Sequence, residues 1–203
     1  MKADLVLNGD FEIVGTNGPT TTHSGTGGVG PSAAANWGVF HQITNPSATT
    51  ETNWKTYTEL LIPTILGSQD PPSDHVLRVE TSHHGNGIVQ TFSPFGTGPN
   101  DALGSIWIFV NGANQQVGVG IGNGGLTQWS AFTSTTGQWE QLTFNNLTSP
   151  VNEMTIFASG GAAEFYVDFA SVSAVPEPCS GSAGLVTGIL ALAFRRKRVI
   201  YLV

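Results

Sequence analysis

Short apolar runs that alternate with small or polar residues constrain the fold of this chain more than any other feature. Residues 75–80 (HVLRVE) place two apolar side chains on one side of an extended chain and Arg78 and Glu80 on the other. Residues 117–122 (VGVGIG) put three apolar side chains on one face and three glycines on the other. A period of two residues is typical of half-buried β-strands.

Glycine, proline and asparagine separate these runs, as expected for short antiparallel strands. The predicted strands are Leu5–Leu7, Trp37–Gln42, His75–Thr81, Ile88–Phe92, Ser105–Asn111, Gln116–Gly122, Gln128–Thr133, Glu140–Phe144, Met154–Ser159 and Phe165–Ser173. Residues 105–110 (SIWIFV) are apolar on both faces, which indicates a central strand. The low-complexity stretch Thr16–Ala35 is predicted to be a flexible loop. The sequence therefore predicts an all-β body that forms an antiparallel β-sandwich.

Length and charge narrow the class of protein. A chain of 203 residues is long enough for one domain plus an appendage, and 39% hydrophobic residues with five tryptophans provide a core. Four of the seven basic residues form one run, Arg195, Arg196, Lys197 and Arg198, and all 14 acidic residues precede it. Because an acidic body repels phosphate backbones, nucleic-acid binding is not expected.

The end of the chain has a pattern of its own. No residue from Cys179 to Phe194 is charged, and the run of four cations follows directly. We interpret this stretch as a hydrophobic helix that enters a membrane, with the cations on the cytoplasmic side and the body outside. A buried core helix is the alternative, but such a helix rarely ends in four consecutive cations. Cys179 is the only cysteine, so no intrachain disulfide can form.

A tripeptide, Pro176, Glu177 and Pro178, precedes the hydrophobic stretch. The tripeptide, the apolar span and the terminal cations together resemble the PEP-CTERM sorting tail of bacterial exported proteins. This resemblance implies recognition by an exosortase-type sorting enzyme, transient membrane anchoring, and residence at the cell envelope or in an exopolysaccharide matrix. The chain would then consist of a body, residues 1–174, and a sorting tail, residues 175–203. Because Met1–Asp4 is not an apolar leader, we expect a signal peptide upstream.

Three blocks of the body carry a second resemblance. Residues 5–12 (LVLNGDFE), 137–142 (GQWEQL) and 165–172 (FYVDFASV) are similar, in this order, to segments of carbohydrate-binding modules with a galactose-binding-like jelly-roll fold. The resemblance implies two antiparallel sheets packed as a jelly roll. It also implies a structural calcium ion where the first and last strands meet.

Calcium prefers six to eight oxygen ligands, among them two or three carboxylates. Glu12 and Asp168 match ligand positions of the family, and Asp10 lies on the same side of an extended segment as Glu12. Phe169 stands where the family usually has a second acid. The alternative role for these acids is hydrogen bonding within turns.

Sugar rings stack on exposed flat aromatic side chains. The aromatic residues in the most polar surroundings are Trp54, Tyr57 and Trp129, which are the predicted sugar-binding residues. The tryptophans at positions where the family packs its core are Trp37, Trp107 and Trp139, and we expect these to be buried. The glycine face of residues 117–122 provides either a flat floor beside an aromatic side chain or room for a covering loop.

Nothing in the sequence predicts catalysis. Neither a His-x-x-x-His pattern nor a Gly-x-Ser-x-Gly elbow occurs, and His83–Gly87 is predicted to be a polar hairpin turn. We therefore expect an exported, envelope-anchored, non-catalytic protein that associates with the cell surface or its polysaccharide matrix and binds a carbohydrate. A purely structural surface protein without a small ligand is the alternative, and a glycan-active enzyme is a third hypothesis.

Overall fold

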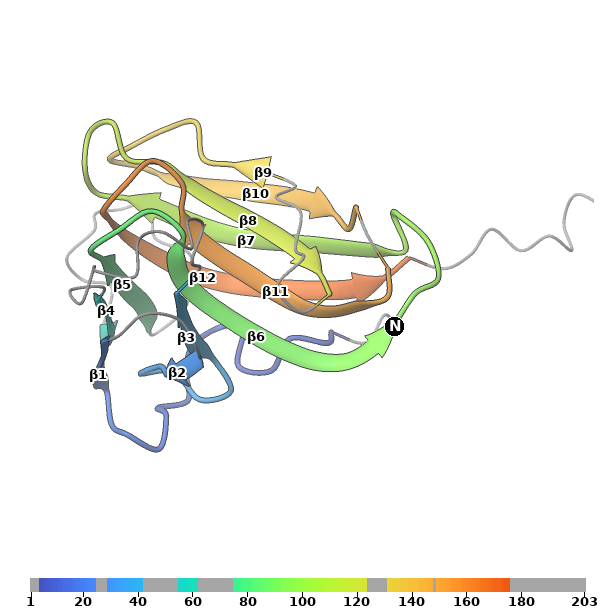
Figure 1. Cartoon of the computed structure of the whole chain (residues 1–203), viewed down its shortest axis with the longest axis horizontal. Helices are drawn as coiled ribbons and strands as arrows, with labels where there is room; N and C mark the ends of the chain where they lie inside the picture. The colour runs from blue at the N-terminus through green and yellow to red at the C-terminus, as the bar shows by residue number, and fades with distance from the viewer. Residues whose placement is uncertain are drawn as a thin grey trace, which may run out of the picture.

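The structure is a computed structural model that describes residues 4–24, 29–41, 55–61, 75–123, 131–147 and 149–175. Within these residues the regular secondary structure consists of β-strands, which form two six-stranded antiparallel sheets (Figure 1). The predicted all-β antiparallel sandwich is thereby confirmed. The predicted C-terminal helix lies outside the described residues.

The first sheet has the strand order β1-β4-β5-β12-β7-β10. Its strands are β1 (Thr20–Ser24), β4 (Lys55–Leu61), β5 (Val76–Thr81), β7 (Ala102–Val110), β10 (Trp139–Asn145) and β12 (Ala163–Ala174). The second sheet has the order β2-β3-β6-β11-β8-β9. Its strands are β2 (Val29–Pro31), β3 (Gly38–His41), β6 (Asn86–Phe95), β8 (Val117–Gly122), β9 (Ala131–Phe132) and β11 (Val151–Ala158). The edge strands β1 and β2 of the two sheets meet at one end of the sandwich (Figure 1).

The main core lies between the sheets. On β7, Ile106, Ile108 and Val110 point inward and are buried, whereas Ser105 and Trp107 point to the outer face. The same alternation on the other long strands brings their apolar side chains into one cluster. Removing this apolar surface from water is the main force that holds the sheets together.

A second apolar cluster lies on the outer face of the first sheet. Val76, Phe109, Trp139 and Tyr166 are each less than a tenth exposed there. Phe109 lies opposite Trp139 on one neighbouring strand and Tyr166 on the other, with ring centroids 5.8 and 5.9 Å apart. The sheet is therefore apolar on both faces at β7, which confirms the prediction of an interior strand for residues 105–110.

Two predictions for the N-terminal region are wrong. Thr16–Ala35, predicted to be a flexible loop, contains β1 and β2, because its threonines favour extended backbone and pair along β4 as an edge strand. Leu5–Leu7, predicted to be a strand, lies in irregular chain and turns. Its one ladder-like contact is the hydrogen bond from the Leu5 N–H to the Val172 carbonyl oxygen, at 2.9 Å.

Two further predictions differ from the structure. Strand β4 was not predicted, because its core-facing positions include Thr56 and Thr58, which are fully buried but polar. His83–Gly87, predicted to be a hairpin turn, instead connects β5 of the first sheet to β6 of the second. Asn86, within this segment, is the fully buried first residue of β6.

Candidate functional site

A cleft lies where the N-terminal segment runs beside the second half of β12. The Ala170 N–H donates to the Gly9 carbonyl oxygen at 2.8 Å, so this segment takes the place that β5 occupies along the first half of β12. The pairing of β12 with β7 shifts register between Asp168 and Ser171, and Phe169 there has a φ of 47°. Bulges of this kind bend a strand and re-aim its side chains.

The N-terminal segment approaches β12 very closely. A Cβ atom on Gly9 would overlap the carbonyl oxygen of Ala170, so only glycine fits at this point. Asn8 and Phe11, on either side, have φ values of 54° and 57°. Residues other than glycine seldom adopt positive φ values. The side chain of Asn8 stabilises the turn, because its Oδ1 accepts from the Ile13 N–H and its Nδ2 donates to the Ile13 carbonyl oxygen.

The cleft has a volume of about 630 Å³. Two aromatic residues, the half-buried Trp107 and Phe169, line it, and Trp107 is in register with Gln141 on β10 and Asp168 on β12. The other polar residues that line it are Asp4, Asn8, Asp10, Ser105, Gln141 and Ser171. The cleft thus combines an indole ring with carboxylates, amides and hydroxyls.

An aromatic ring beside carboxylates and amides is a combination of groups that can bind a sugar. The apolar C–H face of a pyranose packs against an indole ring, while carboxylates and amides bind its hydroxyls. Asp10 and Gln141 are exposed and accessible to a ligand. Asp4 has a structural role as well, because its Oδ1 accepts hydrogen bonds from the N–H groups of Val6 and Val172, at 3.0 and 3.1 Å.

The expectation for the tryptophans is confirmed for two of them and wrong for the third. Trp37 and Trp139 are buried, with 4% and 7% exposure. Trp107 lies on the outer face of β7, because Ile106 and Ile108 occupy the core positions on either side of it. The sequence indicates that a strand apolar on both faces turns one of them away from the main core, but it does not indicate which one.

Tyr57 is the one predicted sugar-binding residue that the structure describes; Trp54 and Trp129 lie outside the described residues. Tyr57 lies on the same outer face as Trp107, in a smaller pocket of about 340 Å³ at the β4–β5 edge. The guanidinium carbon of Arg78 lies 5.6 Å from the centre of its ring. One face of this ring is thus already occupied by a cation.

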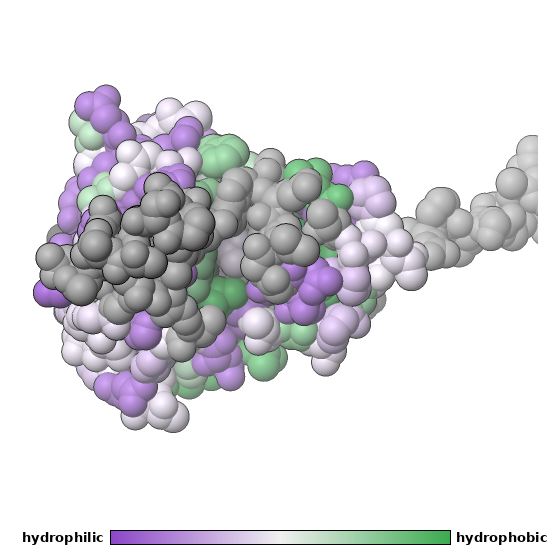
Figure 2. All heavy atoms as spheres, in the orientation of Figure 1, coloured by the Kyte–Doolittle hydropathy of each residue, from purple (hydrophilic) through white to green (hydrophobic). Residues whose placement is uncertain are grey.

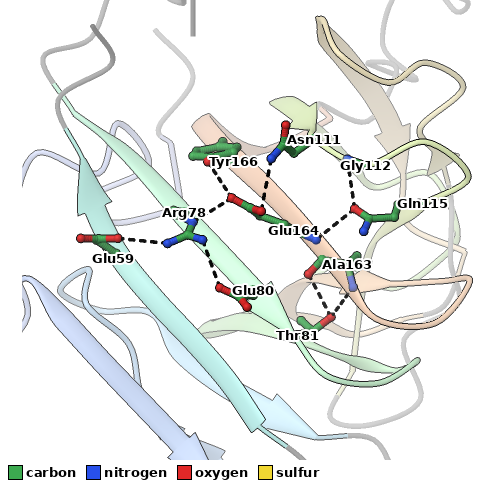
Figure 3. A network of polar contacts seen from close by, with 10 residues as sticks. All are labelled: Glu59, Arg78, Glu80, Thr81, Asn111, Gly112, Gln115, Ala163, Glu164 and Tyr166. Carbon is green, nitrogen blue, oxygen red and sulfur yellow. Dashed lines mark hydrogen bonds and ion pairs between the residues drawn. The ribbon is translucent and has the colours of Figure 1, made fainter. Parts of the chain in front are cut away.

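Arg78 is the centre of a polar network on this half of the sheet (Figure 3). Its Nε donates to Glu164 at 2.9 Å, and its two terminal nitrogens donate to Glu59 at 3.3 Å and Glu80 at 3.1 Å. The phenol of Tyr166 donates to Glu164 at 2.8 Å. One cation therefore holds three carboxylates in place.

This network shifts the pKa values of its members. Burial disfavours the ionised form of Glu164, but hydrogen bonds from Tyr166, Asn111 and Arg78 outweigh it and hold its pKa below the ordinary value. Burial, together with the hydrogen bond to Glu164, raises the pKa of Tyr166 to about 12. Burial acts to lower the pKa of Arg78, but the carboxylates of Glu164 and Glu59 outweigh burial and hold this pKa above its ordinary value.

The predicted calcium ligands do not form one cluster. The N–H of His75 donates to Glu12 Oε1 at 3.0 Å, and His75 Nδ1 lies 2.8 Å from Glu12 Oε2. Asp168 is fully buried and accepts a hydrogen bond from the Phe169 N–H at 2.7 Å, while Asp10 lines the cleft. The described residues contain no group of three or more histidine, cysteine or acidic side chains that could hold a metal ion. Calcium binding stays a prediction.

The glycine face of β8 accommodates aromatic rings. A Cβ on Gly118 would overlap the ring of Phe157 and come within 2.9 Å of the ring of Phe132. Phe157 is buried and Phe132 is 41% exposed, with their ring centroids 6.4 Å apart. Gly118 thus leaves space for side chains of the same sheet.

The predicted sorting tripeptide Pro176, Glu177 and Pro178 and the four terminal cations lie outside the described residues. In the part of the chain that is described, there is no helix with the length and apolar character needed to cross a bilayer.

Neither a protein-family model nor a curated protein sequence matches the chain. Among solved structures, the N-terminal CBM22-1–CBM22-2 tandem domain of Paenibacillus barcinonensis is similar, with a TM-score of 0.50 and 12% identity, over 88% of this chain and 47% of that one. The CBM22-1 xylan-binding domain of the same organism is similar with a TM-score of 0.48 and 10% identity, over 77% of this chain and 100% of that one. The CBM22-1–GH10 modules of a Clostridium thermocellum xylanase, solved with xylohexaose, are similar with a TM-score of 0.46 and 11% identity, over 60% of this chain and 25% of that one.

This chain spans about half of the tandem domain and a quarter of the xylanase modules. At this level of identity the likeness concerns the fold alone. Together with the two antiparallel sheets, it shows that the body of this chain has the jelly-roll fold of carbohydrate-binding modules.

Proposed function

We propose that this protein is a non-catalytic carbohydrate-binding β-sandwich that is displayed at the bacterial cell surface. The observation that carries the proposal is the cleft beside Trp107, in which a partly exposed indole ring lies among carboxylates, amides and hydroxyls. Binding sites for small ligands generally combine a concave apolar surface with a few well-placed polar groups. The fold supports the proposal, since the similar tandem domain consists of two carbohydrate-binding modules.

The charge of the cleft narrows the ligand. Two of its lining residues, Asp4 and Asp10, are acidic, and none is basic. A sugar with carboxylate or sulfate groups would be repelled by these side chains, and no cation would compensate it. The expected ligand is therefore a neutral glycan chain whose rings stack on Trp107 and whose hydroxyls bind Asp10 and Gln141.

The surface location rests on the C-terminal sequence. The Pro176–Pro178 tripeptide, the uncharged stretch and the four cations support export, processing by an exosortase-type enzyme and attachment to the envelope or its exopolysaccharide. Expression of the full chain in a host with such an enzyme, followed by fractionation, tests this. Changing Pro176, Glu177 and Pro178 to alanine should leave the protein in the membrane fraction if the proposal is correct.

The binding proposal is tested by calorimetry and affinity electrophoresis with neutral polysaccharides, such as xylan, mixed-linkage β-glucan and galactomannan, and with acidic polygalacturonate. We expect at least one neutral glycan to bind, and Trp107→Ala to weaken it about 10- to 100-fold, which corresponds to the loss of one stacked aromatic contact. Phe132→Ala is the matched control, because it removes a partly exposed ring from the other sheet. Tyr57→Ala tests the second pocket on the same face.

The outcomes separate the alternatives. If folded wild-type protein binds no glycan, or if Trp107→Ala binds as well as wild type, the Trp107 cleft is not the binding site. Loss of binding in Tyr57→Ala alone would move the site to the β4–β5 pocket. New reducing ends after incubation with a bound glycan would contradict the non-catalytic part of the proposal.

A further inference from the structure

Gln90 on β6 is a buried amide that reaches from the second sheet to the N-terminal segment, which forms one wall of the Trp107 cleft. Its side chain is 2% exposed and lies on the same side of the strand as Ile88, a residue of the main core. The Leu7 N–H donates to Gln90 Oε1 at 2.6 Å, and Gln90 Nε2 donates to the Leu7 carbonyl oxygen at 2.7 Å. Both polar atoms of this amide therefore bind the backbone of one residue.

This pairing takes the place of a neighbouring strand. Leu7 lies in a turn and its side chain is 60% exposed, so its position depends on contacts of its backbone. Two hydrogen bonds to the N–H and the carbonyl oxygen of one residue are what a neighbour in an antiparallel ladder provides. On either side of Leu7, the segment is bonded to β12 through Leu5 and Val172 and through Gly9 and Ala170. Between these two points it is held from the second sheet.

The residues next to Leu7 line the cleft. Val6 and Asn8 both border it, and the exposed Asp10 follows two residues later. The N–H of Leu7 belongs to the peptide plane shared with Val6, and its carbonyl oxygen belongs to the plane shared with Asn8. Because peptide planes are rigid, binding both groups fixes the direction in which the chain enters and leaves Leu7. The orientation of the wall therefore depends on Gln90.

We propose that Gln90 is a positioning residue of the glycan-binding cleft, acting through the Leu7 backbone to hold the wall that carries Asp10 in its ligand-binding position. This inference rests on the proposed function of the cleft. A wall that is fixed before the ligand arrives reduces the entropy lost on binding. None of the described residues that line the cleft belongs to the second sheet. Through Gln90 that sheet contributes to the affinity without touching the glycan.

A second buried amide provides a matched control. Asn146 is fully buried, its Oδ1 accepts from the Ala102 N–H at 2.8 Å, and its Nδ2 donates to the Gly98 carbonyl oxygen at 2.9 Å. It is not among the residues that line the Trp107 cleft. Gln90→Met and Asn146→Leu each remove at least two hydrogen bonds to the backbone, so both should lower the melting temperature by roughly 4–10 °C. Only a positioning role predicts that the two variants differ at the cleft.

Hydrogen–deuterium exchange of the full chain measures the wall itself, without a ligand. In Gln90→Met, exchange should accelerate about tenfold or more in the peptide that contains Leu7 and at the Ala170 N–H, whose acceptor lies in the same segment. In Asn146→Leu, both should exchange as in wild type. Exchange of this segment that is no faster in Gln90→Met than in Asn146→Leu overturns the proposal.

The affinity is then measured by calorimetry, well below the melting temperatures, with the neutral glycan that wild type binds most tightly. Gln90→Met should weaken binding about tenfold, and Asn146→Leu less than about twofold. Wild-type affinity in Gln90→Met overturns the proposal. So does an equal loss of affinity in both variants, because a general loss of stability would then explain it.

Gln90→Glu adds a rescue by pH and serves if Gln90→Met fails to fold. An ionised carboxylate accepts from the Leu7 N–H but cannot donate to its carbonyl oxygen, whereas a protonated carboxyl group does both. Because burial raises the pKa of a carboxyl group, the affinity of this variant relative to wild type should recover between about pH 8 and about pH 5. A constant ratio across this range contradicts the positioning role.

The inference and the proposed function fail in different ways. If wild type binds no glycan, the proposed function fails, and the exchange measurement alone decides whether Gln90 holds the wall. If wild type binds a glycan through Trp107 and Gln90→Met changes neither exchange nor affinity, the inference fails and the proposed function stands.

Discussion

The outer face of the first sheet has two halves that treat their acidic side chains in opposite ways. Around Arg78, on β4, β5 and the first half of β12, Glu59, Glu80 and Glu164 are all bound by one guanidinium (Figure 3). Around Trp107, beside the second half of β12, Asp10 is exposed at the wall of a cleft. In the first half charge stabilises the fold, and in the second it is available to a ligand.

The difference arises from how β12 is paired. Its first half, up to Val167, lies in regular register with β5, which carries Arg78 opposite Tyr166. Beyond Asp168 its register with β7 shifts, and the irregular N-terminal segment replaces β5 as its neighbour. A regular ladder brings side chains into contact across strands, whereas a bulge separates them and leaves a cleft. The space-filling view shows apolar and polar residues interspersed on the face of the molecule that it presents (Figure 2).

The largest expected effect is at the point where the cleft half depends on close backbone contact. Gly9→Ala would drive a methyl group into the carbonyl oxygen of Ala170, and neither backbone can yield easily. We expect a loss of about 2–4 kcal/mol in the free energy of unfolding, measured with urea, together with weaker glycan binding. Gly98→Ala is the control, since its Cβ would only meet the Asp101 carboxylate at 3.8 and 3.9 Å. Equal stabilities of the two variants would show that the N-terminal segment is not a rigid wall.

The second-largest expected loss of stability is in the Arg78 half of the outer face. Arg78→Met keeps the length of the side chain but leaves three neighbouring carboxylates without their cation. Because these groups are only partly buried, we expect a loss of about 1–2 kcal/mol in unfolding free energy and no change in glycan binding at the Trp107 cleft. Lys55→Met, which removes an exposed cation from β4, should change the stability by less than about 0.5 kcal/mol. A parallel loss of binding in Arg78→Met would mean that the two halves are coupled.

Acid should weaken the Arg78 half selectively. The pKa of Glu164 is lower in the folded protein than in the unfolded chain, so its stabilising contribution is present above the unfolded value and is lost as the pH falls through the folded value. We expect the urea concentration at the unfolding midpoint of wild type to decrease as the pH falls below about 4.5, the ordinary pKa of a glutamate. Glu164→Gln should be less stable at neutral pH and should show a shallower decline in acid. Identical pH profiles would exclude Glu164 as a source of the acid sensitivity.

Calcium should have the smallest effect. Both oxygens of the Glu12 carboxylate contact His75, and Asp168 is fully buried beside Phe169. Because the predicted calcium ion would have to compete with these contacts, adding Ca²⁺ to chelator-treated protein should raise the melting temperature by only about 1–2 °C. A rise of several degrees that Glu12→Gln abolishes would establish the calcium site that the sequence predicts and would place it beside the cleft.

The sequence was informative about strands and less so about faces. Alternation in residues 75–80 and 117–122 located β5 and β8 to within a residue or two, because a period of two depends only on local geometry. The same argument failed for β4, whose inward positions are threonines. It also could not assign Trp107, because the choice of which apolar face of β7 meets the second sheet depends on strand neighbours far away in the chain.

Local patterning by itself determined the all-β class, the interior position of residues 105–110, and the acidic character that argues against nucleic acid. Only the tertiary structure decided which side chains share a site. The cleft joins residues near the N-terminus to Trp107, Gln141 and Ser171, and the imidazole rings of His23 on β1 and His41 on β3 come together from different sheets. Such meetings are set by strand order, register and one bulge, which arise from packing between segments that are distant in sequence.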